Sequence, residues 1–567
     1  MSDHEGAPDE GGRQMSGRRL LEVAVVAALV VGYALVHRAY LVPVIGGSDA
    51  NGYLMCARMF ADHGRFHQLV TDPFSFVGQM WVFQEHGVYY PKYPPLLGLL
   101  VGTVMRVFGD DAGFAVNSLA AAAAVAGVYV LCRSRLPAWA AVLAAVAAAT
   151  NPVLNSFAVR QHSHALSTAC VTWSFALLLW ATRRKADRWS FAMLLGSGFA
   201  LGYSMGVRYP NALLAAAALF WLLAFRRDRR WPRTAAWLGG FAVPCGFLAF
   251  YHWTTFGSPL RTAYALTHEQ TGFRWFWIVK HVKDYLPGLA THGVGPWLAL
   301  SGAGWLGLWL HCRREGIFFT LWMLPLALVY MAYYWLFDGQ EVIYMRFFLP
   351  LLPALLLLAM LFVQELRGRF ADDVRRWRWG VAGLLLVQLV WGVPLSLAEM
   401  EQRYALHDRM HRRIEFVREH VPSGAAVISE INLIDSLSFD QRYTLYWSEI
   451  LAQDALRYSL HRALAGGLDS HQPARLQQWR DLLLDLEPEE FDRRIRGWLS
   501  ERLAQGRLFL VAKTTTILAT REAYRDSFEL RDVAQLPGSR DRFVLYNPAE
   551  MNRVRPATQI VEFVQSR

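Results

Sequence analysis

Long apolar segments separated by short polar loops make up most of residues 20–399. A helix needs about 20 mainly apolar residues to cross the hydrocarbon core of a membrane. The pattern therefore predicts a polytopic α-helical membrane protein with about eleven spans. The predicted spans lie near residues 20–42, 112–132, 137–155, 164–182, 189–206, 209–225, 234–253, 296–311, 316–336, 347–365 and 379–397.

One apolar run does not fit this series. Residues 94–108 begin with Pro94-Pro95 and are too short to span a membrane. Counting them as a span would also reverse the charge bias of the loops that follow. We therefore expect an interfacial or re-entrant helix inside a first external loop at 43–111. In the alternative interpretation, the two prolines only start a helix.

The pattern changes near residue 400, where charged residues become frequent and strand-like runs alternate with amphipathic segments. The predicted helices lie at 411–421 and 476–503, and the predicted strands at 425–431, 508–513 and 543–546. We expect a cytoplasmic tail at 1–19, a membrane domain at 20–399 and a soluble α/β domain at 400–567.

Arginine clusters indicate the orientation of the spans. They fall at 133–135, 183–188, 226–233, 313–314 and 367–378, all on one side of the predicted helices. Cytoplasmic loops carry such an excess, so the N-terminus is predicted inside and the C-terminal domain outside. The net charge of +11 lies largely in these short loops, which argues against a nucleic-acid partner. Arginine far outnumbers lysine, which suggests a GC-rich bacterial genome and hence an inner-membrane protein.

Asp49 is the most informative carboxylate of the chain. It stands in Gly46-Gly47-Ser48-Asp49, directly after the first predicted span. An acid at a membrane surface is costly unless water, a partner or a substrate meets it. Asp49 is therefore a candidate catalytic base, and the alternative is an ordinary N-cap of the next helix.

Cations and aromatic residues gather in loops predicted on the same side as Asp49. They are Tyr53, Lys92, Tyr93, His162, His164, Arg208, Tyr264, Tyr344 and Arg346. Simpler interpretations remain for some of them, since Arg208 could snorkel to the membrane surface and the histidines could be interfacial polar residues. A metal at His162 and His164 would need further ligands, which the sequence does not identify.

In this order, the motifs resemble those of the GT-C superfamily of integral-membrane glycosyltransferases, near the protein O-mannosyltransferase and lipid A aminoarabinose transferase group. The resemblance covers roughly residues 15–400 and rests on four matches. They are Asp49 followed by Tyr53 and Arg58, Lys92-Tyr93-Pro94-Pro95 leading to Phe108-Gly109, Gly198 and Gly202 before Arg208 and Pro210, and Tyr344 with Arg346 and Pro350.

This resemblance implies an inverting transfer from a polyprenyl-phosphate-sugar donor to a lipid, glycan or protein acceptor outside the cytoplasm, among membrane lipids. Asp49 would be the general base. The implied contacts to the donor phosphate are Lys92, Arg208 and Arg346. The implied substrate contacts are Tyr53, Tyr93, His162, His164, Tyr264 and Tyr344.

The chain also departs from the group. Members often carry an acid in the second short external loop, where this chain has Gln161-His162-Ser163-His164. No Trp-Trp-Asp-Tyr-Gly motif is found, which speaks against an oligosaccharyltransferase. No cofactor is assigned, and a divalent metal stays open. The rival functions are a flippase or transporter of lipid-linked glycans, which needs similar external cations, and a non-catalytic membrane scaffold.

Overall fold

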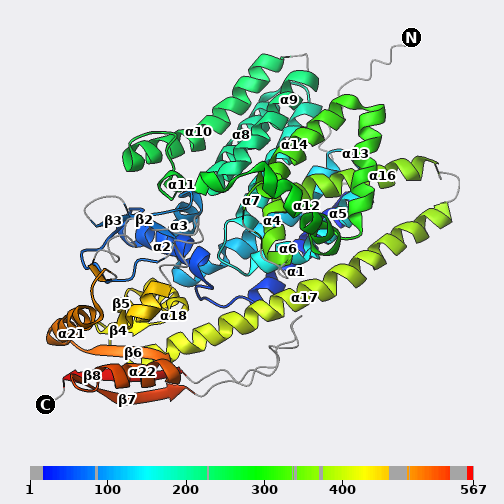
Figure 1. The fold of residues 1–567 in the computed structure, drawn as a ribbon. Coiled ribbons are helices and arrows are strands. Elements are labelled where there is room, and N and C mark those ends of the chain that lie inside the picture. The colour runs from blue at the N-terminus through cyan, green and yellow to red at the C-terminus, as the bar shows by residue number, and fades with distance from the viewer. Residues whose placement is uncertain are drawn as a thin grey trace, which may run out of the picture.

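The computed structural model describes residues 17–565, apart from 79, 84–86, 226–228, 268, 335, 337–340, 370–373, 459–481, 484 and 537–557. The described chain forms a helical body, and a small sheet domain follows it at one end (Figure 1).

Eight helical segments in the described part of the chain are long and apolar enough to cross a membrane. They are built from α1 (Gly17–Ala39), α4 (Asp110–Arg133), α7 (His164–Arg183), α8 (Arg188–Val207), α10 (Arg230–Phe256), α14 (Arg313–Met331), α16 (Leu352–Arg369) and α17 (Val374–His420). The segment that ends in α16 also includes α15 (Glu341–Met345) and η4 (Arg346–Leu351). The expectation of a polytopic helical membrane protein is confirmed.

Eight of the eleven predicted spans meet this criterion in the described residues, and the bent pair at 137–155 would make a ninth. The segment predicted at 137–155 divides into α5 (Ala138–Ala149) and α6 (Pro152–Ala158), which are bent by 58°. Pro152 has no N–H for the helix ladder and disfavours helical backbone at Asn151, which instead caps α6. The segment predicted at 209–225 opens as the 3-10 helix η1 (Tyr209–Leu214) before α9 (Ala215–Phe225), and α13 (Trp297–His311) has only 15 residues.

Glycines allow α8 and α10 to pack with their backbones in contact. A Cβ atom at Gly198 would collide with the carbonyl oxygen of Trp237, and one at Gly202 would crowd that of Phe241. The same holds for Gly240 against the carbonyl of Leu195. Small residues at such spacing are typical of close helix pairs in membranes. The pair fixes the end of α8, from which Arg208 projects.

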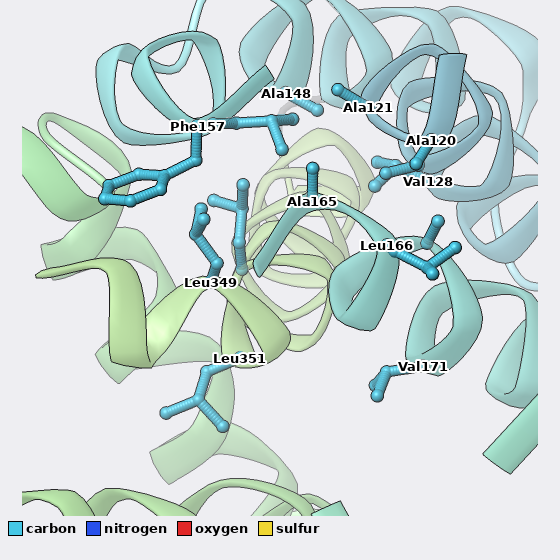
Figure 2. Close-up of a cluster of buried hydrophobic side chains, with 14 of the residues drawn as sticks. Ala120, Ala121, Val128, Ala148, Phe157, Ala165, Leu166, Val171, Leu349 and Leu351 are labelled. Atoms are coloured by element: carbon cyan, nitrogen blue, oxygen red, sulfur yellow. The ribbon is translucent and has the colours of Figure 1, made fainter. Parts of the chain in front are cut away.

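The apolar core reaches the candidate site at Phe157. Figure 2 shows Phe157 of α6 and Leu349 of η4 in one cluster with Ala165 of α7 and Ala148 of α5. The Phe157 ring also contacts the rings of His162 and His164, with centroids 5.5 and 5.0 Å away. The packing of this core therefore sets the positions of both histidines.

The segment predicted as the first external loop contains two helices and a small antiparallel sheet. Helix α2 (Ser48–His63) packs on α3 (Leu96–Phe108), and the strands β1 (Gln68–Leu69), β2 (Trp81–Phe83) and β3 (Val88–Pro91) pair in the order β1-β3-β2. Pro95 is the N-cap of α3, which agrees with a helix that the prolines start. Helix α3 buries Val101 and exposes Phe108, as expected of a short amphipathic helix.

A second stretch of short elements precedes the last spans. It consists of α11 (Ala263–Leu266), η2 (Glu269–Gly272), α12 (Trp275–Gly288) and η3 (Leu289–Gly293).

Helix α17 joins the membrane domain to the C-terminal domain without a break at residue 400, so the predicted helix at 411–421 is its last part. The domain holds a five-stranded sheet in the order β5-β4-β6-β8-β7. The strands are β4 (Ala426–Ser429), β5 (Thr444–Trp447), β6 (Leu508–Lys513), β7 (Phe528–Leu536) and β8 (Thr558–Gln565). The helices are α18 (Ile431–Leu437), η5 (Ser438–Asp440), η6 (Ser448–Leu451), α21 (Pro488–Gln505) and α22 (Thr514–Tyr524).

This mixed sheet with helices agrees with the predicted α/β domain. Strands β4 and β6 match the predictions at 425–431 and 508–513, and α21 matches the later part of the helix predicted at 476–503. The strand predicted at 543–546 and residues 476–481 lie outside the described residues.

Candidate active site

Asp49 lies in the first turn of α2, close to three side chains from other parts of the chain. Its Oδ1 accepts a 2.6 Å hydrogen bond from the Tyr93 hydroxyl. Its Oδ2 lies 3.4 Å from Nη1 of Arg346 and 3.7 Å from Nδ1 of His162. The N-cap of α2 is Gly47, so the N-cap interpretation of Asp49 is wrong. The Asp49 side chain is 26% exposed, which leaves it accessible to a substrate.

The electrostatic surroundings keep Asp49 ionised. Burial raises the pKa of Asp49. The charge of Arg346 lowers it most, followed by His162 and the hydrogen bond from Tyr93, and together they hold the pKa at about 2. Burial lowers the pKa of His162 to about 4, so its imidazole is neutral near pH 7. Arg346 is therefore the cation that matters most for the charge of Asp49.

Tyr53 supports the hydrogen bond between Tyr93 and Asp49. The two tyrosine rings stack with centroids 4.3 Å apart and an interplanar angle of 15°. The Tyr53 hydroxyl donates a 2.9 Å hydrogen bond to Oγ of Ser163, in the loop between the two histidines. One turn of α2 thus connects Asp49 and Tyr53 to the loop before α7.

Arg208 points into the protein interior. Its Nε donates to the Tyr330 hydroxyl at 3.0 Å, and its Nη1 lies 3.1 Å from Oγ of Ser163 and 3.2 Å from Nε2 of His164. The guanidinium also lies 5.3 Å from the centroid of the Phe347 ring. These contacts place Arg208 beside the Asp49 group and do not fit a side chain that snorkels to a membrane surface.

Lys92 is paired with an acid that the sequence did not reveal. Its ammonium group forms an ion pair with Glu269 of η2, and the two side chains are 2% and 9% exposed. Tyr333 donates a hydrogen bond to the same carboxylate. The Lys92 ammonium lies 5.3 Å from the centroid of the Tyr264 ring. In the sequence, Glu269 is an acid in an aromatic segment between two predicted spans, and nothing local identifies Lys92 as its partner.

Tyr344 is the predicted residue that lies apart from this group. Its hydroxyl donates a 3.3 Å hydrogen bond to the carbonyl of Asp284 in α12, and its ring packs beside Gly288. The other predicted residues lie in two adjoining groups. Asp49 is surrounded by Tyr53, Tyr93, His162, His164, Arg208 and Arg346, whereas Lys92 and Tyr264 adjoin Glu269.

Ser163 and Glu269 are the main site residues that sequence reasoning missed. Ser163 accepts hydrogen bonds from both Tyr53 and Arg208 and so connects the base-bearing helix to a cation. Within the described residues, no three His, Cys, Asp or Glu side chains converge as metal ligands would. Asp49 instead directs its oxygens to Tyr93 and Arg346.

Residues 92–253 match the family model described as dolichyl-phosphate-mannose-protein mannosyltransferase. The structure is similar to that of ArnT from Cupriavidus metallidurans bound to undecaprenyl phosphate, with a TM-score of 0.60 and 13% identity over 97% of this chain and 98% of ArnT. The chain has the GT-C glycosyltransferase fold. The predicted resemblance is thereby confirmed at the level of the fold.

Two further solved structures share the GT-C fold of this chain. ArnT in the apo state aligns with a TM-score of 0.57 and 12% identity, over 96% of this chain and 98% of that one. The oligosaccharyltransferase of Archaeoglobus fulgidus, tethered with an acceptor peptide, aligns with a TM-score of 0.50 and 13% identity, over 96% and 74%. No curated protein matches this sequence.

The family match covers part of the candidate site. It begins at Lys92 and takes in Tyr93, His162, His164 and Arg208. Asp49 and Arg346 lie on either side of the matched segment, so only the fold of the chain brings them together.

Proposed function

We propose that this protein transfers one sugar, with inversion, from a polyprenyl-phosphate-linked donor to an acceptor hydroxyl outside the cytoplasm. The acceptor is a lipid, a glycan or a protein, and the membrane is a bacterial inner membrane with the C-terminal domain on its periplasmic side. The observation that carries the proposal is one accessible, ionised carboxylate, Asp49, beside the guanidinium group of Arg346. Arg208 is connected to the same helix turn, because it and Tyr53 both donate to Ser163. The structure of ArnT bound to undecaprenyl phosphate, which shares the fold, supports a lipid-phosphate donor.

The reaction assigns separate tasks to the carboxylate and the cations. The acceptor oxygen forms a bond to the anomeric carbon while the bond from that carbon to the phosphate oxygen breaks. The phosphate leaves with the electron pair, and Arg208 and Arg346 stabilise its growing charge. The acceptor proton passes to Asp49, which acts as general base.

Donor binding would also activate the base. In the free protein, Arg346 lies against Asp49 and lowers its pKa. A donor phosphate within reach of Arg346 competes for the same guanidinium and adds a negative charge near the carboxylate. Both effects raise the pKa of Asp49, so its basicity increases when the donor arrives.

The test is Asp49→Asn, measured as transfer of labelled sugar from a polyprenyl-phosphate-sugar in membranes, together with lipid-linked sugar profiles of the cells. Loss of a general base costs about 10²- to 10⁴-fold in rate. We expect Asp49→Asn to lower transfer by such a factor and the lipid-linked donor to accumulate. The matched control is Asp62→Asn on the same helix, because Asp62 forms a half-exposed pair with Arg58 that contributes little.

Full activity of Asp49→Asn would overturn the general-base assignment. Donor accumulation in cells without the protein, with full rescue by Asp49→Asn, would favour the transporter or scaffold instead.

A further inference from the structure

The helix that carries Asp49 starts without a side-chain cap of its own. Its N-cap is Gly47, which has no side chain to accept from the first-turn amides and has φ +121°, in the region that favours glycine. The preceding residue, Gly46, packs directly against the His407 ring of α17. Local sequence therefore does little to fix the direction in which the first turn of α2 points.

The C-terminal domain holds this turn by other hydrogen bonds, made by α18 and by Ser438 directly after it. Nδ2 of Asn51 donates to the carbonyl of Asp435 and to Oγ of Ser438, both at 2.8 Å. Oγ of Ser48 lies 3.3 Å from Oδ2 of Asp435. Just before the helix, the carbonyl of Ile45 accepts a 2.8 Å hydrogen bond from Ser436.

These bonds are made away from water, which increases their value as positional constraints. Asn51 is 1% exposed and Asp435 is fully buried. Polar groups buried in this way are costly unless they keep their partners, so the two elements resist separation. Burial, with Asp49 nearby, raises the pKa of Asp435 to about 8, and this side chain is mainly neutral near pH 7. The C-terminal domain therefore does not place a second full negative charge beside the base.

Asp49 and Asn51 lie on different faces of the same turn. Asp49 faces Tyr93 and Arg346 of the membrane domain, whereas Asn51 faces the C-terminal domain. A rotation of the turn by a small angle would change both sets of contacts together. Since misplacement of a catalytic group by about 1 Å can cost 10²-fold in rate, this contact matters for turnover.

We propose that the C-terminal domain is a working part of the active site: α18 holds the first turn of α2, and Asn51 is the positioning residue that sets where Asp49 lies. The inference rests on the proposed role of Asp49 and adds a route by which the extracytoplasmic domain controls it. An acceptor or partner that shifted α18 would alter transfer without touching Asp49.

The test compares Asn51→Ala with Tyr446→Phe in the full-length protein. Tyr446 donates a 2.8 Å hydrogen bond to Asp72, so Tyr446→Phe also removes a bond between the first external loop and the C-terminal domain, away from α2. We expect Asn51→Ala to lower kcat by about 10- to 100-fold with donor KM within about twofold. Tyr446→Phe should leave both constants unchanged.

Hydrogen–deuterium exchange of the amides of residues 48–53 gives a readout that does not depend on activity. Exchange there should become faster in Asn51→Ala and, independently, in Ser438→Ala, which changes only the C-terminal side of the contact. Unchanged exchange in both variants, or an equal loss of kcat in Tyr446→Phe, would overturn the inference. If the wild type transfers no sugar yet exchange at 48–53 rises, the proposed function fails while the contact between α18 and α2 stands.

Discussion

Nη1 of Arg346 lies 3.4 Å from Oδ2 of Asp49, so the candidate base and a candidate phosphate ligand are partners before any substrate binds. The pairing explains how a partly buried carboxylate stays ionised, since burial alone would raise its pKa. It also means that a substitution of Arg346 acts on Asp49 as well as on the donor.

Replacement of Arg346 should therefore change the pH dependence of transfer. In the wild type, the pKa of Asp49 is about 2, so the base is ionised throughout pH 4–8. In Arg346→Gln the main lowering influence is gone, burial dominates and the pKa rises. We expect kcat/KM of this variant to fall as the pH is lowered through the new pKa, with an acid limb that the wild type lacks in this range.

The measurement is log kcat/KM against pH for both proteins. Arg261→Gln is the control, because Arg261 is an exposed cation outside the candidate site. Parallel profiles for Arg346→Gln and the wild type would contradict the pairing.

Lys92 should behave differently from the two arginines, because Glu269 holds it in a buried ion pair. Lys92→Ala leaves the carboxylate of Glu269 buried and unpaired, which typically costs about 3–5 kcal/mol. The double variant Lys92→Gln with Glu269→Gln keeps two neutral partners and should be clearly more stable than Lys92→Ala. Thermal unfolding of the purified proteins distinguishes them, and equal melting temperatures would refute the expected cost.

A phosphate role of Lys92 predicts in addition that the stable double variant binds donor lipid more weakly. Donor KM in that variant isolates the binding effect from the loss of stability.

Arg208→Lys tests whether charge alone suffices beside Ser163. Lysine keeps the positive charge but loses the planar set of donors that reaches Tyr330, Ser163 and His164 at once. We expect donor KM to rise about tenfold or more, which corresponds to ~1.4 kcal/mol. Arg261→Lys serves as control, and an unchanged KM in Arg208→Lys would remove Arg208 from the donor site.

The α8–α10 contact predicts a loss of stability without a change in chemistry. Gly198→Ala would push a methyl group into the carbonyl of Trp237, at an expected cost of about 1–3 kcal/mol. The control is Gly246→Ala in α10, where a Cβ atom meets nothing within 4 Å. Only Gly198→Ala should lower the melting temperature; a fall in both, or in neither, would argue against close packing at this point.

Most of the membrane architecture could be predicted because the length and polarity of a span are local properties. The structure differs from the prediction where short local features interrupt an apolar run. Pro152 breaks the segment predicted at 137–155, and the turn at Pro210 shortens the next predicted helix to α9. The boundary near residue 400 follows a real change of composition, but α17 continues through it because helix formers extend to His420.

The site residues could be proposed one by one, since a charged or aromatic residue beside a predicted span is conspicuous in the sequence. Asp49, Arg208 and Arg346 were found in this way, and the structure places all three in one group of side chains. Ser163 and Glu269 were not found, because neither a serine between two histidines nor an acid in a loop shows in the sequence which residues it contacts.

The sequence by itself determined that this chain is a multi-pass helical membrane protein, and which side chains were worth testing. Both follow from local hydrophobicity and from the cost of placing charge near a membrane. Only the tertiary structure decided that Arg346 and Tyr93 meet Asp49, that Glu269 captures Lys92, and that Asn51 anchors the same turn to Asp435. These partners lie far apart in the chain, and contacts at such separation depend on how helices and domains pack, which no local pattern specifies.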